Sequence, residues 1–171
     1  MELKIFETLS SINVNDKVEK KNGLSYLTWS WAWSEFVKVC PSAKYEVKMF
    51  DNKPYIYDEK LGYMVFTSVS VGDDTKEMWL PVMDGANKSM KDHPYQYEVR
   101  RKNFNTGAIE IVKKTCEPAT MFDINKTLMR CLVKNIAMFG LGLYIYSGED
   151  LPQEKQDNDR WDGLEKHNSN T

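Results

Sequence analysis

Three basic residues in the second half of the chain have the spacing of a binding surface. Lys126, Arg130 and Lys134 follow one another at intervals of four residues. On a helix this spacing places all three side chains on one face, and no acid stands four residues from any of them. An unpaired row of cations could neutralise the phosphates of a nucleic-acid backbone. The plain alternative is a solvated helix face, which would be the favoured interpretation for an isolated helix.

A second group of bases falls on two segments that are expected to form a β-hairpin. If the hairpin turns through residues 104–107, Arg101 faces Glu110 and Lys113 faces Glu98 across the strands. The other bases of the hairpin would then be left for contacts outside it. The candidate DNA contacts in this group are Arg100, Arg101, Lys102, Lys113 and Lys114.

Four aromatic residues crowd into eight positions near the N-terminus, namely Tyr26, Trp29, Trp31 and Trp33. Single-stranded DNA is commonly held by bases stacked on such rings beside a basic groove. Tryptophans in globular domains more often fill a core or a subunit interface, and we favour that interpretation over base stacking.

Carboxylates that could hold Mg²⁺ for a nuclease are Asp84, Asp123, Glu149 and Asp150. No lysine stands beside them in the arrangement that nuclease motifs use, and Asp84 and Asp123 could equally cap a loop and a helix start. The sequence also lacks the GxxxxGK[ST] phosphate loop of ATP-driven recombinases. We therefore expect a protein without catalytic residues.

The cysteines and histidines give no pattern of a metal or redox site. Cys40, Cys116 and Cys131 are odd in number and far apart, so we expect ordinary thiols in or near the core. His93 and His167 have no partner at ligand spacing and are expected to be exposed. Neither a metal nor a cofactor is predicted.

Charge is distributed unevenly along the 171 residues, whose net charge is −2. The residues from Glu149 onward hold seven acids and three bases, a net of −4, so residues 1–148 carry +2. We predict one folded domain over 1–152 and an acidic, disordered tail over 153–171. The sequence has no apolar run long enough for a membrane span and no signal peptide, which predicts a cytoplasmic protein.

The pattern of apolar residues predicts an α+β domain, an antiparallel β-meander packed on a long helix. A helix is expected through Trp29–Val39 and ending before Pro41, although Trp29, Trp31 and Trp33 also alternate as in a strand. A long helix is expected from about Ala119 to Phe139, with its apolar face formed by Met121, Ile124, Leu128, Cys131, Leu132, Met138 and Phe139. The expected strands are Tyr45–Phe50, Tyr63–Val71, Lys76–Val82, Tyr95–Lys102, Ile109–Thr115 and Leu141–Tyr146.

Four segments resemble the signatures of the Sak3-type phage single-strand annealing proteins. They are residues 24–33 (LSYLTWSWAW), 121–126 (MFDINK), 129–134 (MRCLVK) and 139–152 (FGLGLYIYSGEDLP), and the resemblance covers most of 23–152. It implies a protein of phage homologous recombination and DNA repair that pairs complementary strands without ATP in the bacterial host cytoplasm. It also implies a Rad52-like core assembled into an oligomeric ring.

In the wider superfamily that this resemblance implies, single-stranded DNA lies in a groove between a β-hairpin and the helical stem. On this chain that groove would be lined by Lys126, Arg130, Lys134 and the bases of the second hairpin. The alternatives are a single-stranded DNA-binding protein that does not anneal and, further away, a metal-dependent nuclease. The acidic tail, with Trp161, is a hypothetical contact for a host single-strand binding protein, against the alternative of an inert solubilising segment.

Overall fold

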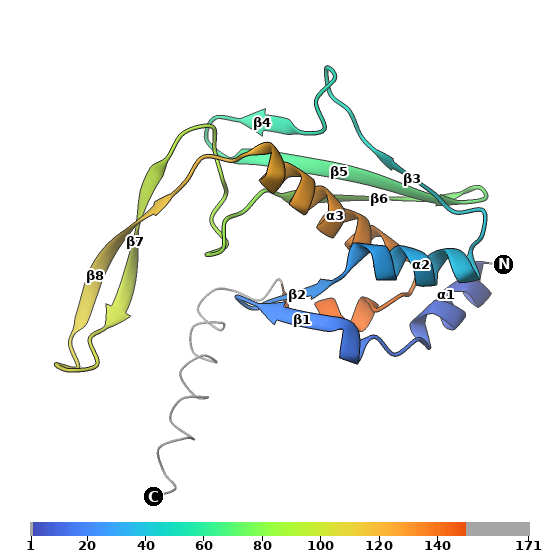
Figure 1. Ribbon diagram of the computed structural model, residues 1–171, viewed down its shortest axis with the longest axis horizontal. Coiled ribbons are helices and arrows are strands. Elements are labelled where there is room, and N and C mark those ends of the chain that lie inside the picture. Colours follow the sequence, from blue (N-terminus) through green and yellow to red (C-terminus); the bar gives the residue numbers. More distant parts are fainter. Residues whose placement is uncertain (1, 150–171) are drawn as a thin grey trace, which may run out of the picture.

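The computed structural model describes residues 2–149, so the predicted boundary at 152 and the predicted tail lie outside the described residues. The described chain is a mixed α+β fold with three α-helices and antiparallel strand pairs (Figure 1). Its helices are α1 (Glu2–Ser10), α2 (Trp29–Val39) and α3 (Met121–Ala137), with 3-10 turns η1 (Asn15–Lys17) and η2 (Leu143–Tyr146). Its strands are β1 (Val18–Lys21), β2 (Leu24–Leu27), β3 (Lys44–Val47), β4 (Ile56–Asp58), β5 (Gly62–Val71), β6 (Asp74–Pro81), β7 (Tyr95–Lys102) and β8 (Ile109–Cys116).

The largest sheet is built around β5. Strand β6 pairs with it through the turn at Gly72, while β3 and β4 pair with other parts of β5. The strands predicted over 63–71 and 76–82 are confirmed to within two residues. The strand predicted over 45–50 is shorter than expected, because Asp51 and Asn52 adopt left-handed backbone conformations and Phe50 only bridges to Lys53.

Helix α3 packs against the buried face of this sheet. Val65, Thr67 and Val69 alternate with less buried residues along β5, as expected for a strand with one covered face. Buried polar groups join the two layers, since Asn135 Nδ2 donates to the Thr67 carbonyl oxygen at 3.1 Å. The described part of the fold has two clusters of buried hydrophobic residues, and α3 contributes to both of them through Ile124, Leu128, Cys131, Leu132 and Ile136.

The predicted apolar stripe of α3 was wrong at Met121 and at Met138. Met121 is 62% exposed and Met138 is 37% exposed. Met121 is the first helical residue and Met138 is the C-cap, whereas Phe139, the last residue of the predicted stripe, is buried at 3% exposure. Periodicity alone does not show which residues at a helix end are covered.

Helix α2 confirms the helical interpretation of the tryptophan-rich segment, and the strand alternative was wrong. Phe36 of α2 is fully buried and its ring lies 5.3 Å from that of Phe139. The same core contains Leu9 of α1. The first 22 residues, which carry no strong pattern in the sequence, thus contribute both a packed helix and the hairpin strand β1.

The strand predicted over Leu141–Tyr146 was wrong, because this segment forms the 3-10 turn η2. Gly140 and Gly142 have φ values of +120° and +65°, which curl the backbone away from an extended path. A Cβ at Gly140 would lie 2.7 Å from the carbonyl oxygen of Phe6, so this glycine also permits α1 to approach.

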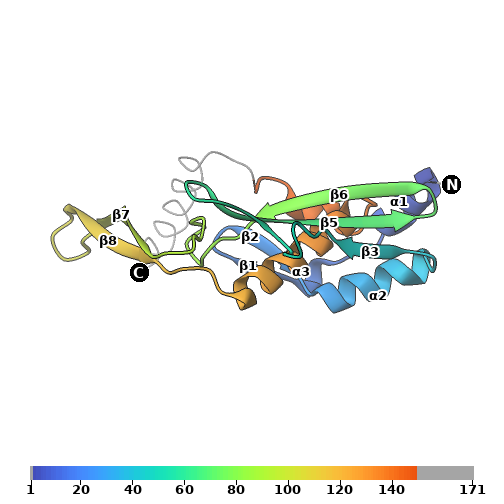
Figure 2. The same ribbon diagram turned by 90° about the horizontal axis from the view of Figure 1, so that it is seen from above.

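The β7–β8 hairpin projects from the rest of the molecule (Figures 1 and 2). Its register is the predicted one, with Arg101 opposite Glu110 and Glu98 opposite Lys113. Its base is anchored by Tyr95, which packs against the same core as the buried Cys116. Within residues 2–149, none of the helices is long and apolar enough to span a membrane.

Candidate functional site

The three bases of α3 are paired with acids, so the expectation of an unpaired row was wrong. Lys126 Nζ lies 3.1 Å from Asp123 Oδ1, three residues earlier in the helix. Arg130 and Lys134 lie 3.2 and 2.9 Å from the same oxygen, Oε2 of Glu149. A spacing of four residues along α3 reveals neither partner, because Asp123 is three residues from Lys126 and Glu149 comes from a distant segment.

Glu149 joins three parts of the fold. Its Oε1 accepts a hydrogen bond from the backbone nitrogen of Ser25 in β2 at 2.7 Å, while Oε2 binds α3. The Glu149 side chain is 5% exposed, and the side chains of Arg130 and Lys134 are 13% and 17% exposed. Two cations against one carboxylate leave this largely desolvated cluster with a net charge of +1.

Aromatic rings flank both cations of this cluster. The Arg130 guanidinium lies 5.1 Å from the ring centre of Tyr26, and Lys134 Nζ lies 5.1 Å from that of Tyr146. Burial raises the pKa of the Tyr146 hydroxyl, and the Glu149 carboxylate raises it further. Arg130 Nε is buried and finds no acceptor among the described residues. The cluster therefore holds a donor that its present partners do not use.

A hollow opens beside this cluster, between β2 and α3. The four aromatic residues predicted for base stacking or core packing lie in two different places. Tyr26 and the 42% exposed Trp29 line the hollow, whereas Trp31 and Trp33 pack against the core. The remaining lining residues are Glu19, Ser25, Leu27, Thr28, Lys126, Met129, Arg130, Val133 and Tyr146.

The five bases of the hairpin are all exposed. Pairing divides them between two faces, because residues directly opposite one another share a face. Arg100 and Lys113 lie on one face with Ile111, which is 63% exposed. Lys102 shares that face, while Arg101 and Lys114 lie on the other.

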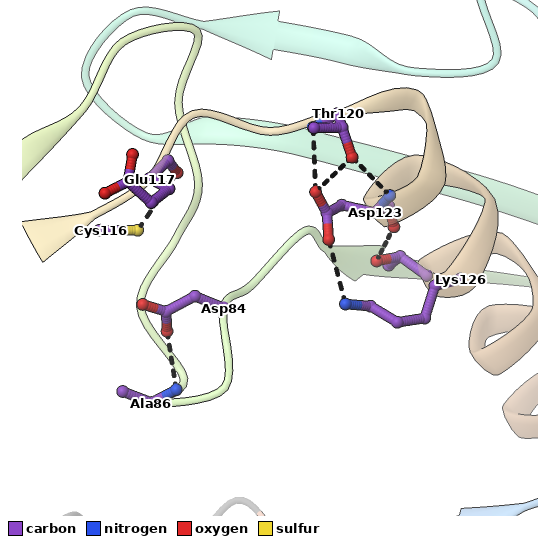
Figure 3. Close-up of polar contacts among 8 residues, drawn as sticks. Asp84, Ala86, Cys116, Glu117, Thr120, Asp123 and Lys126 are labelled. Atoms are coloured by element: carbon purple, nitrogen blue, oxygen red, sulfur yellow. Dashed lines mark hydrogen bonds and ion pairs between the residues drawn. The ribbon is translucent and has the colours of Figure 1, made fainter.

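Two of the carboxylates considered for a nuclease, Asp84 and Asp123, have structural partners (Figure 3). Asp123 closes a capping box at the start of α3, with Oδ2 accepting from Thr120 N and Thr120 Oγ1. Burial raises the pKa of Asp123, but these bonds and Lys126 together lower it further, so that it lies below the ordinary 3.8. Asp84 accepts from the backbone nitrogens of Ala86 and Lys88. The capping interpretation of both residues is confirmed.

The part of the chain that the structure describes contains no group of three or more His, Cys, Asp or Glu able to hold a metal. Asp150 and His167 lie outside it, and His93 is exposed beside Asp92. Cys40, Cys116 and Cys131 are buried as predicted. Burial raises the pKa of all three thiols, that of Cys131 to about 11, which makes them poor nucleophiles.

Two residues of the site were missed in the sequence. Phe122 is 74% exposed and lies on the same face of α3 as Lys126, whose Nζ is 5.9 Å from its ring centre. Phe122 stands four residues before Lys126, and this spacing could have indicated that the two side chains share one face of α3. Glu149 was considered only as a metal ligand, and no local pattern points to its pairing with α3.

Comparison with known proteins identifies a family over almost the whole chain. The model of the family described as Sak Single Strand Annealing Protein matches residues 4–171. No curated protein and no solved structure matches the chain. The family match is longer than the resemblance over 23–152, and it takes in most of α1, all of β1 and the acidic C-terminal residues.

Proposed function

The chain belongs to the Sak single strand annealing protein family, and from this we propose that it binds single-stranded DNA and pairs complementary strands in phage recombination and repair. The match over residues 4–171 is the observation that carries the proposal. The signature segments favour the Sak3-type branch. The antiparallel sheet backed by α3 is compatible with a Rad52-like core.

The contact surface that we propose runs between the projecting hairpin and α3. The hairpin offers exposed cations, and the hollow beside α3 offers Tyr26 and Trp29 with Lys126 at its edge. Phosphate neutralisation together with base stacking is the usual way in which single strands are held without sequence preference. Phe122 adds a further exposed ring on the same helix face.

Annealing on such a surface needs no nucleotide hydrolysis. Cations reduce the repulsion between two strands, and bases that stay exposed can test one another for complementarity. Base pairing supplies roughly 1.4 kcal/mol per step, so neither ATP nor a metal ion is required. The protein would therefore act as an annealing factor and not as an enzyme. In a ring of subunits, several weak DNA-binding sites would act together and hold a long strand tightly.

The deciding experiment is annealing of fluorescent oligonucleotides in the presence of EDTA and without ATP. Complementary pairs should anneal faster with the protein, while scrambled pairs should not. Binding without acceleration would instead indicate a single-stranded DNA-binding protein that does not anneal. Shortened oligonucleotides after addition of Mg²⁺ would indicate a nuclease.

The acidic segment 153–171 is proposed to contact a host single-strand binding protein in the bacterial cytoplasm. Its composition, with Trp161 among acids, supports this proposal. Removal of 153–171 should slow annealing only on strands coated with that protein. Equal rates for both chains on coated strands would argue for an inert solubilising segment.

A further inference from the structure

We propose that Arg130 and Lys134 form a phosphate site and that Glu149 occupies this site until single-stranded DNA displaces it. The inference rests on the proposed function, and it assigns a regulatory role to a residue of this chain. It makes the C-terminal end of the described chain a competitor of DNA for the same two cations.

The chemistry of the cluster suits a phosphate at least as well as a carboxylate. Arg130 and Lys134 converge on one oxygen, Oε2 of Glu149. A phosphate also presents anionic oxygens, and arginine binds it through two parallel N–H groups. Arg130 Nε is the donor that Glu149 leaves unused. A backbone phosphate could accept from Nε and the terminal nitrogen together.

The position of the cluster gives DNA a path to it. Arg130 lines the hollow, and its guanidinium lies against Tyr26. A base stacked on Tyr26 or Trp29 would bring its neighbouring phosphate beside Arg130. Arg130 is thus buried toward Glu149 but belongs to the wall of an open hollow, and Tyr146, against which Lys134 lies, belongs to the same wall.

Throughout this exchange the two buried cations would keep an anionic partner. Removing a partner from a buried ion pair without replacement is strongly unfavourable. Replacing a carboxylate by a phosphate leaves neither Arg130 nor Lys134 without an anion. Glu149 follows Gly148, whose φ of +86° marks a turn at this end of the chain.

The salt dependence of binding tests this exchange. In the wild-type protein, the phosphate would replace Glu149 and release few counterions from Arg130 and Lys134. In Glu149→Gln these cations hold counterions that DNA must release. The slope of log K against log salt should therefore steepen by about one unit, because one carboxylate has been removed. Affinity at ~0.1 M salt should rise roughly tenfold.

Glu35→Gln is the matched control. Glu35 pairs with Lys38 at 2.6 Å on α2, so its replacement changes net charge equally and also breaks an ion pair. Its affinity for an oligothymidylate probe should change less than about twofold, with the wild-type slope. An equal gain in both variants would show a general charge effect and would overturn the proposal.

Glu149→Asp guards against a folding defect in the first variant. It keeps the charge but draws the carboxylate back, so its affinity should lie between those of wild type and Glu149→Gln. Thermal unfolding confirms that each variant is folded. Folded variants that bind the probe no more tightly than wild type would show that Glu149 only clamps the fold. Wild-type protein that fails to bind the probe would instead overturn the proposed function.

Discussion

The bases of α3 and the bases of the β7–β8 hairpin are held in different ways. Arg130 and Lys134 are mostly buried and share the carboxylate of Glu149. Arg100 and Lys114 stand on exposed strands that project from the body of the molecule (Figure 1). The first pair contributes to the fold as well as to any binding, whereas the second group can meet phosphates without breaking a buried contact.

This difference predicts that stability and DNA affinity depend on separate regions. An exposed cation contributes little to folding, because a surface ion pair is worth at most about 1 kcal/mol. Removing a buried cation costs more folding free energy, because its anionic partner is left buried without a counter-charge. Variants in the two regions should therefore move two different measurements.

The largest effect is expected when the hairpin loses its charge. Replacing Arg100, Arg101, Lys113 and Lys114 together with alanine should lower the salt slope of single-stranded DNA binding by roughly three units. Affinity at ~0.1 M salt should fall roughly a thousandfold. Fluorescence anisotropy over a salt series measures both quantities. An unchanged slope in a folded variant would exclude the hairpin as the contact surface.

Truncating an apolar side chain should reduce the free energy of unfolding much more in α3 than in the hairpin. Leu132→Ala, at a fully buried position of α3, should cost roughly 3–4 kcal/mol in the free energy of unfolding. Ile111→Ala, on the exposed hairpin face, should change it by less than about 0.5 kcal/mol. Urea unfolding followed by circular dichroism compares the two. A large cost at Ile111 would reveal that this face is covered by another subunit.

Loss of one cation from each region sharpens the comparison. Arg130→Ala should cost roughly 2–3 kcal/mol of unfolding free energy, less than a fully broken buried pair because Lys134 still faces Glu149. Arg100→Ala should lie within about 0.5 kcal/mol of wild type. The same urea titration applies. Equal costs at both positions would mean that burial does not distinguish the regions.

The smallest effect concerns the capping box of α3. Asp123→Asn should cost about 1 kcal/mol near pH 7. Because folding lowers the pKa of Asp123, its stabilisation is present above the ordinary value of 3.8 and is lost as pH falls through the lowered pKa. Unfolding at pH 7 and near pH 3 should show the difference shrinking. A difference of the same size at both pH values would contradict this assignment.

The elements that local signals specify could be predicted from the sequence. The turn at Gly72 and the alternating residues on either side indicated the β5–β6 pair, and the turn length indicated the register of β7 with β8. Helix α2 was predicted because the pattern continued to Pro41. These features depend on neighbouring residues, which a sequence displays directly.

The features that were missed depend on contacts between distant residues. Glu149 lies 15 and 19 residues beyond the two bases that it binds, so no helical spacing reveals the pairing. The 3-10 turn η2 was read as a strand because its apolar residues outweighed the two left-handed glycines. Helix α1 was missed because its buried Leu9 owes its burial to segments from the other end of the described chain.

The contacts between α1 and the chain near η2 have a consequence for biosynthesis. Val14 N donates to the Tyr144 hydroxyl at 3.1 Å, and Phe6 lies against Gly140. The ribosome makes the segment around Leu9 well over a hundred residues before the segment against which it packs. The core around Leu9 cannot close in that interval, so residues 2–14 should stay accessible to chaperones and proteases until synthesis has passed residue 144.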